Sequence, residues 1–186
     1  MITSVLPMDQ NESSLSDFIS LMKEVTAHGG GADEIMARLR EPARRLASSR
    51  SWIDRRCSEG LELGRNLVHE EPDHSLAILL VKWRAGSRAP AHDHGTWALI
   101  AGIEGEEINT LWRRKDDGSR AGFAEIEEFS QVAVGPGRVL CIGERDIHTV
   151  NTPSPALAVH IYGMNTEYIE RNIFDPVGKT VRRSRF

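Results

Sequence analysis

The chain lacks several features that would place it in a specialised class of protein. Its 186 residues include only two cysteines, Cys57 and Cys141, which are too few for the disulfide framework of a small secreted domain. No apolar run approaches the roughly 20 residues needed to span a bilayer. The N-terminus also lacks a basic segment followed by an apolar run, the pattern of a signal peptide. We therefore expect no membrane partner and a reducing, cytoplasmic location.

The chain also lacks an excess of positive charge. Its formal net charge is −4, so no overall basic field attracts nucleic acid or anionic lipid. The one dense basic run is the tail from Lys179 to Arg185, which we interpret as a solvated or frayed terminus. The remaining composition is ordinary, with 40% hydrophobic and 27% charged residues. This is enough apolar material for one hydrophobic core without disulfide bonds.

The first third of the chain has helical patterning. Leu15, Phe18 and Met22 recur at helical spacing before a break at 29–31, which is three glycines. Apolar residues predict a second helix over 33–48, in which Pro42 should cause a kink or a break. A further turn or short helix is expected near 49–57. We interpret residues 1–60 as a helical cap.

From Leu61 onwards the pattern changes to short β-rich runs separated by Gly, Pro, Asp and Asn. Such runs predict a sandwich or barrel, and no alternation of strands and helices supports a parallel sheet. The predicted strands lie near residues 62–69, 75–84, 96–102, 105–114, 122–132, 138–142, 147–151 and 156–163. We therefore predict a mainly β fold, with a barrel over 61–165 and a C-terminal extension over 166–186 of undetermined structure, all within one structural domain.

Three histidines carry the strongest chemical signal. His92 and His94 are separated by one residue, and side chains at such positions of a strand point to the same face, where both can reach one ion. An isolated pair of this kind is more often a surface feature. His148 strengthens the case, because it lies in a similar strand-like setting after the turn residues 135–137. Asp93 should point to the opposite face and serve a structural purpose.

The segment Gly86–His94 resembles the first motif of the cupin superfamily, which is a glycine, five residues and His-x-His. His148 resembles the single histidine of the second motif. The carboxylate ligand of that family would fall at Ala98 or Leu99, and Glu104 lies too far along the chain to replace it. The resemblance implies a double-stranded β-helix, or jelly-roll, barrel with a three-histidine metal site. Ligand type alone leaves iron, zinc, nickel, copper and manganese open.

Two further segments resemble the cysteine dioxygenase-like thiol dioxygenases, a branch of the cupins. Arg65 begins an Arg-Asn-Leu segment like the one whose arginine binds the substrate carboxylate in that family, and His160 and Tyr162 match its His-x-Tyr strand. This likeness extends from about Gly64 to Gly163. It implies an Fe(II) cofactor, catalytic roles for Tyr162 and His160, and substrate binding by Arg65. The alternatives are a surface salt bridge for the arginine and ordinary core packing for the other two.

Three positions near these motifs qualify the resemblance. The stretch 96–99 contains no cysteine, so we predict no thioether crosslink to the tyrosine, and Ala158 stands where the family has a serine. Both departures resemble the bacterial branch of the family. Trp97 follows His94 closely and is either a substrate-binding residue or a core aromatic.

The resemblance as a whole implies an iron-dependent thiol dioxygenase, either a monomer or a homodimer. Its substrates would be O₂ and a small thiol carboxylate, namely cysteine, 3-mercaptopropionate or mercaptosuccinate, and its product a sulfinate. The alternatives are another metal-dependent cupin enzyme, such as a different dioxygenase or an isomerase, and a non-catalytic small-molecule sensor.

Overall fold

The computed structural model describes residues 15–185, so residues 1–14 of the predicted cap and residue 186 lie outside the described part. Three helices come first and eleven strands follow. The helices are α1 (Leu15–Ala27), α2 (Ala32–Ser48) and α3 (Arg50–Ser58). The strands are β1 (Gly64–Glu70), β2 (Ser75–Trp83), β3 (Ser87–His92), β4 (Ala98–Glu104), β5 (Glu107–Arg114), β6 (Ile126–Val134), β7 (Val139–Ile142), β8 (Ile147–Thr152), β9 (Ala156–Met164), β10 (Arg171–Asp175) and β11 (Thr180–Ser184).

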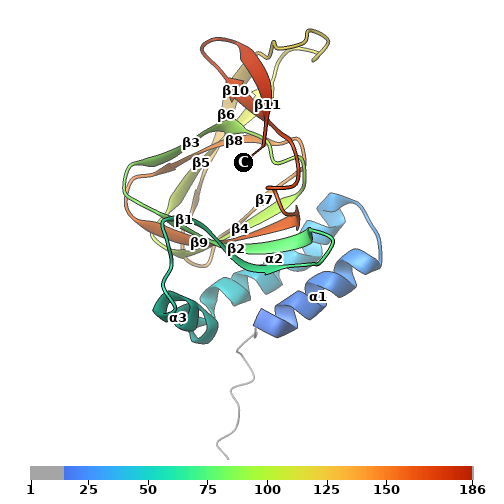
Figure 1. The fold of residues 1–186 in the computed structure, drawn as a ribbon. Helices are drawn as coiled ribbons and strands as arrows, with labels where there is room; N and C mark the ends of the chain where they lie inside the picture. Colours follow the sequence, from blue (N-terminus) through green and yellow to red (C-terminus); the bar gives the residue numbers. More distant parts are fainter. Residues whose placement is uncertain (1–14, 186) are drawn as a thin grey trace, which may run out of the picture.

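The strands form two sheets that face each other around a common interior (Figure 1). The first sheet has the order β1-β2-β9-β4-β7, and the second has the order β11-β10-β3-β8-β5-β6. All pairings between these strands are antiparallel. Strands β2 to β9 contribute four to each sheet, and the first of them pairs with the last, which is jelly-roll topology. The predicted fold class, mainly β with a cupin-type barrel and N-terminal helices, is confirmed.

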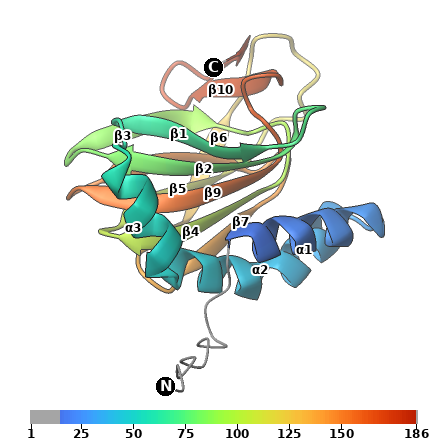
Figure 2. The same cartoon turned by 60° about the horizontal axis from the view of Figure 1, so that its bottom comes forward.

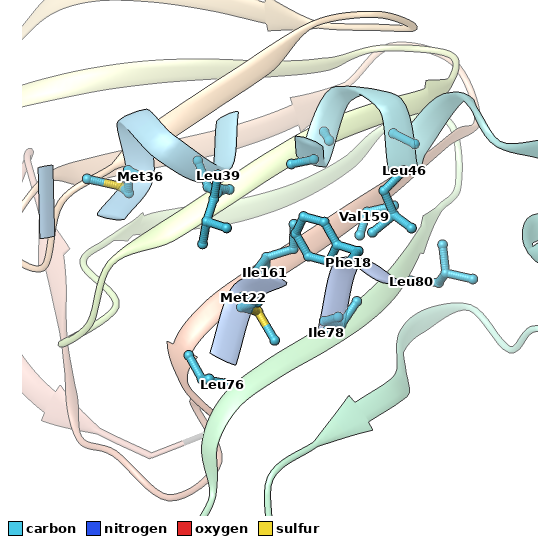
Figure 3. Packing of buried hydrophobic residues seen from close by; sticks show 14 of the residues in the cluster. Phe18, Met22, Met36, Leu39, Leu46, Leu76, Ile78, Leu80, Val159 and Ile161 are labelled. Carbon is cyan, nitrogen blue, oxygen red and sulfur yellow. The ribbon is translucent and has the colours of Figure 1, made fainter. Parts of the chain in front are cut away.

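The helices cover the outer face of the first sheet (Figure 2). Figure 3 shows Phe18 and Met22 of α1 between α2 and the sheet. Their neighbours in this fully or almost fully buried cluster include Leu39, Leu46, Leu76, Ile78, Leu80, Val159 and Ile161. The apolar stripes of α1 and α2 therefore find their partner on the barrel wall, as amphipathic helices require.

Strand β9 shows how the first sheet is buried on both faces. Val159 and Ile161 point outward into the cluster under the helices, whereas Ala158 and Tyr162 point into the barrel. Successive side chains of a strand alternate in direction, and here each direction meets a packed layer. An apolar run in the sequence can therefore be a strand buried on both sides.

Several local predictions were wrong. Of the kink or break expected at Pro42, the break is wrong, because helix α2 runs through Pro42 and its buried face continues past the proline with Ala43 and Leu46. The predicted strand ranges omitted β3, although His92 and His94 were expected on a strand, and the strand expected from residue 96 begins at Ala98. The basic tail, expected to be solvated or frayed, is solvated, since Arg182, Arg183 and Arg185 are exposed, but it is not frayed, since β11 pairs with β10 over five residue pairs. No helix of the described chain is long and apolar enough to cross a membrane.

Candidate metal centre

The three predicted histidines meet inside the barrel. His92 is the last residue of β3 and lies directly opposite His148 on β8. His94 lies two residues beyond the end of β3, not on the strand as expected, and Gly95 turns the chain after it with a φ of 66°. All three side chains are buried, and their potential ligand atoms lie within 4.8 Å of one another. The fold thus brings together His94 and His148, which are 54 residues apart in the sequence.

Hydrogen bonds fix which ring nitrogen of two histidines carries hydrogen. Nδ1 of His92 lies 2.7 Å from the carbonyl oxygen of Pro90, which can only accept, so this Nδ1 donates and Nε2 keeps its lone pair. Nδ1 of His148 lies 2.8 Å from Oδ1 of Asn109. The Asn109 amide nitrogen donates to the Glu107 carbonyl, which places its oxygen toward His148. Both imidazoles therefore offer Nε2 as a metal ligand, with an outer partner that orients the ring.

The spacing and charge of the three rings suit one divalent ion. Nε2 of His94 and Nε2 of His148 are 3.2 Å apart, and two nitrogens at ~2.1 Å from one ion would be roughly 3.0–3.4 Å apart. Burial lowers the pKa of His92 to about 4 and holds those of His94 and His148 well below their usual value. Metal binding requires neutral imidazole. The three residues therefore fit a divalent transition metal with open coordination positions.

The neighbouring residues add no carboxylate ligand. Ala98 is completely buried in the cluster inside the barrel, so the position where a cupin carboxylate was considered holds a methyl group. Asp93 is also buried, but its two oxygens accept hydrogen bonds from the backbone and side-chain nitrogens of Asn172 at 2.8 and 2.6 Å. Asp93 thus ties the metal-ligand loop to β10.

A cavity of about 90 Å³ opens onto the three histidines. It is lined by His160 and Tyr162 of β9 and by two arginines, Arg65 of β1 and Arg171 of β10. No aspartate or glutamate of the described chain is among its lining residues. A surface hollow of about 870 Å³ includes none of the three histidines. The candidate metal-binding histidines therefore face the small cavity. Its volume is far below the roughly 300–1,000 Å³ of drug-sized pockets.

The two arginines reach the cavity from different sheets. Arg65 donates from Nη2 to Oγ1 of Thr166 at 2.6 Å, and its Nη1 lies 3.9 Å from a carboxylate oxygen of Glu167. Burial and, next, the positive charge of Arg65 lower the pKa of Arg171 to about 10, so the Arg171 side chain is cationic at neutral pH. Sequence reasoning missed Arg171, because it lies in the unassigned tail and only the pairing of β10 with β3 brings it to the site.

His160 and Tyr162 form a buried hydrogen-bonded pair. Nδ1 of His160 is 3.0 Å from the Tyr162 hydroxyl, and its Nε2 is 3.0 Å from Oε1 of Glu107. The Tyr162 ring stands edge-on to His94, with ring centroids 5.2 Å apart. Burial raises the pKa of Tyr162 to about 12, so the phenol stays protonated at neutral pH. Sequence reasoning missed Glu107, although its two-residue spacing from Asn109 is a signal for a shared strand face.

Trp97 lies away from the cavity. It immediately precedes β4 and packs with Leu99 and Ile161 in the cluster between the first sheet and the helices. It is not among the residues that line the cavity. The strand alternation that turns Ala98 inward turns its two neighbours outward, so the structure gives Trp97 a packing position.

No family model matches the chain. Among solved structures, the chain is similar to the DMSP lyase DddQ from Ruegeria pomeroyi DSS-3, with 20% identity, coverage of 55% of this chain and 45% of that one, and a TM-score of 0.41. It is also similar to a cupin superfamily protein from Desulfitobacterium hafniense DCB-2, with 14% identity, coverage of 56% and 79%, and a TM-score of 0.42. A third similar structure is a protein with a double-stranded beta-helix domain from Klebsiella pneumoniae, with 13% identity, coverage of 61% and 80%, and a TM-score of 0.44.

These likenesses concern the fold only, and the chain spans less than half the length of DddQ. The class of protein is defined by the chain's own strand order and histidine geometry. It is a jelly-roll protein of cupin fold with a buried group of three histidines that could hold one metal ion.

Proposed function

We propose that this protein is an iron(II)-dependent thiol dioxygenase that oxidises a small thiol carboxylate to its sulfinate. The reaction is R–S⁻ + O₂ → R–SO₂⁻, in which sulfur loses four electrons, O₂ gains them, and both oxygen atoms end on sulfur. The observation that carries the proposal is the shared cavity. Three neutral imidazoles and two guanidiniums line one space of about 90 Å³, and these are the groups needed to hold a metal and an anionic substrate together.

Each part of the substrate would meet a different part of the cavity. His92, His94 and His148 would hold the iron through their Nε2 atoms. Iron(II), when bound, supplies neighbouring open positions for a thiolate and for O₂ and the redox capacity for sulfur oxidation. The guanidiniums hold the carboxylate end, since their planar forks match carboxylates. Fixing both ends of a short substrate places its sulfur beside the histidines and removes most of the entropic cost of the encounter.

The number of arginines favours one substrate within this class. Arg65 and Arg171 line the same cavity from opposite sheets, so two carboxylates can each meet a guanidinium. Mercaptosuccinate has two carboxylates, whereas 3-mercaptopropionate has one. Cysteine brings an ammonium group to a cavity that has two guanidiniums and no acidic lining residue in the described chain. We therefore propose mercaptosuccinate as the preferred substrate and cysteine as the poorest of the three.

The test is oxygen consumption by the iron-loaded, full-length protein with these three thiol acids. We expect the highest kcat/KM with mercaptosuccinate and a sulfinate product that takes both oxygen atoms from ¹⁸O₂. Succinate, which lacks the thiol, is the control and should consume no oxygen. An iron-loaded protein that consumes no oxygen with any of the three thiols would contradict the proposal. A protein that binds no stoichiometric metal would instead indicate a non-catalytic sensor.

A further inference from the structure

A buried carboxylate lies behind the cavity without lining it. The side chain of Glu107 is 1% exposed. Its Oε1 lies 3.0 Å from Nε2 of His160 and 2.6 Å from Nε1 of Trp83. Burying a carboxylate is costly unless its hydrogen bonds are satisfied. The other oxygen of Glu107, Oε2, is buried without a hydrogen-bond partner in the described chain, so the two hydrogen bonds to Oε1 are what hold this carboxylate in place.

The tryptophan sets the direction of the hydrogen bonds. An indole nitrogen can only donate, so Oε1 of Glu107 accepts from Trp83 and acts as an acceptor. The same oxygen faces Nε2 of His160, and because an ionised carboxylate can only accept, that nitrogen must carry hydrogen for a bond to form. In a neutral imidazole the other nitrogen, Nδ1, then has the lone pair. It lies 3.0 Å from the Tyr162 hydroxyl, so the phenol donates to it.

We infer that Glu107 is a positioning residue that orients the hydroxyl of Tyr162 through His160. The chain of donors runs from Tyr162 to His160 to Glu107. The single phenol hydrogen is engaged with His160, and the oxygen lone pairs of Tyr162 turn toward the cavity. Tyr162 therefore serves the cavity as a hydrogen-bond acceptor, where Arg65 and Arg171 supply donors.

The carboxylate of Glu107 supplies His160 with a hydrogen-bond partner that strand β9 itself does not provide. Ala158 lies two residues before His160 on the same inward face of β9, and its methyl group can neither accept nor donate. The partner of His160 comes instead from β5 of the opposite sheet, 53 residues away in sequence. The orientation of Tyr162 thus depends on His160 of its own strand and, through His160, on a bond across the barrel.

The first test is the tautomer of His160, measured by long-range ¹H–¹⁵N NMR on the full-length protein loaded with Zn(II). We expect hydrogen on Nε2 in the wild type. Glu107→Gln should retain that tautomer, because the amide oxygen still accepts. Glu107→Ala should lose it and give a mixture. Hydrogen on Nδ1 in the wild type, or an unchanged His160 in Glu107→Ala, would overturn the inference.

The second test is turnover with iron and mercaptosuccinate, and this part depends on the proposed function. Glu107→Ala should lower kcat about 10- to 100-fold, as loss of an orienting partner typically does, with KM changed less than about twofold and iron content unchanged. Glu107→Gln should recover most of kcat. Glu106→Ala removes the neighbouring exposed carboxylate and should behave as wild type. An undiminished kcat in Glu107→Ala would overturn the inference.

The two tests separate the inference from the proposed function. If the wild type consumes no oxygen with any thiol, the dioxygenase proposal fails, and the His160 tautomer still decides the role of Glu107. If Glu107→Ala does not fold, the wild-type spectrum and the Glu107→Gln variant decide it, because neither requires loss of the side chain.

Discussion

Glu107 and Asn109 lie two positions apart on β5 and hold two different histidines. Glu107 accepts from Nε2 of His160 at 3.0 Å, and Asn109 accepts from Nδ1 of His148 at 2.8 Å. Both side chains point into the barrel because they share a strand face. One short segment of β5 therefore orients a candidate metal ligand and, separately, the histidine that bonds to Tyr162.

Metal affinity should depend on Asn109 as well as on the ligands. His148→Ala removes a ligand and should abolish stoichiometric metal binding. Asn109→Ala leaves all three ligands in place but removes the acceptor that orients His148, so metal affinity should fall about 10- to 100-fold. Competition with a chelator, followed by metal analysis, measures both. Equal affinity in Asn109→Ala and wild type would show that the hydrogen bond to His148 does not support the site.

The two arginines should separate the substrates. Arg171→Ala should raise KM for mercaptosuccinate about tenfold or more, since a hydrogen-bonded charged partner is lost, and should affect 3-mercaptopropionate less. Arg65→Ala should weaken binding of both thiol acids without loss of metal. Arg88→Ala, an exposed arginine on β3, is the control and should match wild type. Steady-state oxygen consumption measures these values, and identical KM ratios in all variants would contradict the two-carboxylate assignment.

The stability of the metal-free protein should fall as the pH falls below about 6.5. Burial lowers the pKa of His92 from 6.5 to about 4 in the folded state, so between these values the unfolded state binds more protons. The free energy of unfolding therefore decreases toward low pH, by at most about 1.4 kcal/mol per pH unit for each such histidine. Urea unfolding at several pH values measures this.

A matched variant tests whether the buried histidines cause the effect. His148→Gln removes one titrating ring and should make the pH dependence shallower. A pH dependence equal to that of the wild type would assign the effect to other groups.

The helical cap should contribute to stability and not to the site chemistry. Phe18 of α1 is fully buried against the outer face of the barrel (Figure 3), so Phe18→Ala should lower the free energy of unfolding by about 3–5 kcal/mol. Ser20→Ala, at an exposed position of the same helix, should change it by less than about 0.5 kcal/mol. Urea unfolding measures both. Loss of metal from folded Phe18→Ala would show that the cap also supports the metal centre.

Two members of the three-histidine group could be predicted because their spacing is local. His92 and His94 are close in sequence, and a known motif covers the stretch from Gly86. The same reasoning placed His160 and Tyr162 together, because two residues on one strand share a face. It extended the strand too far at His94, which lies beyond the end of β3. It also left open whether Trp97 binds substrate or packs in the core, and the structure packs Trp97 in the cluster under the helices.

The sequence by itself determined the fold class and the helical beginning through periodicity, and the pair His92 and His94 through short spacing. It indicated His148 through the resemblance of its segment to the second cupin motif. Only the tertiary structure brought Arg171 and Asn109 to these histidines and Glu107 to His160. Each acts across a sheet or between sheets, on a partner at least 39 residues away or, for Arg171, on a cavity shared with Arg65. Such contacts depend on which strands pair and which way each side chain points, and no local pattern encodes that choice.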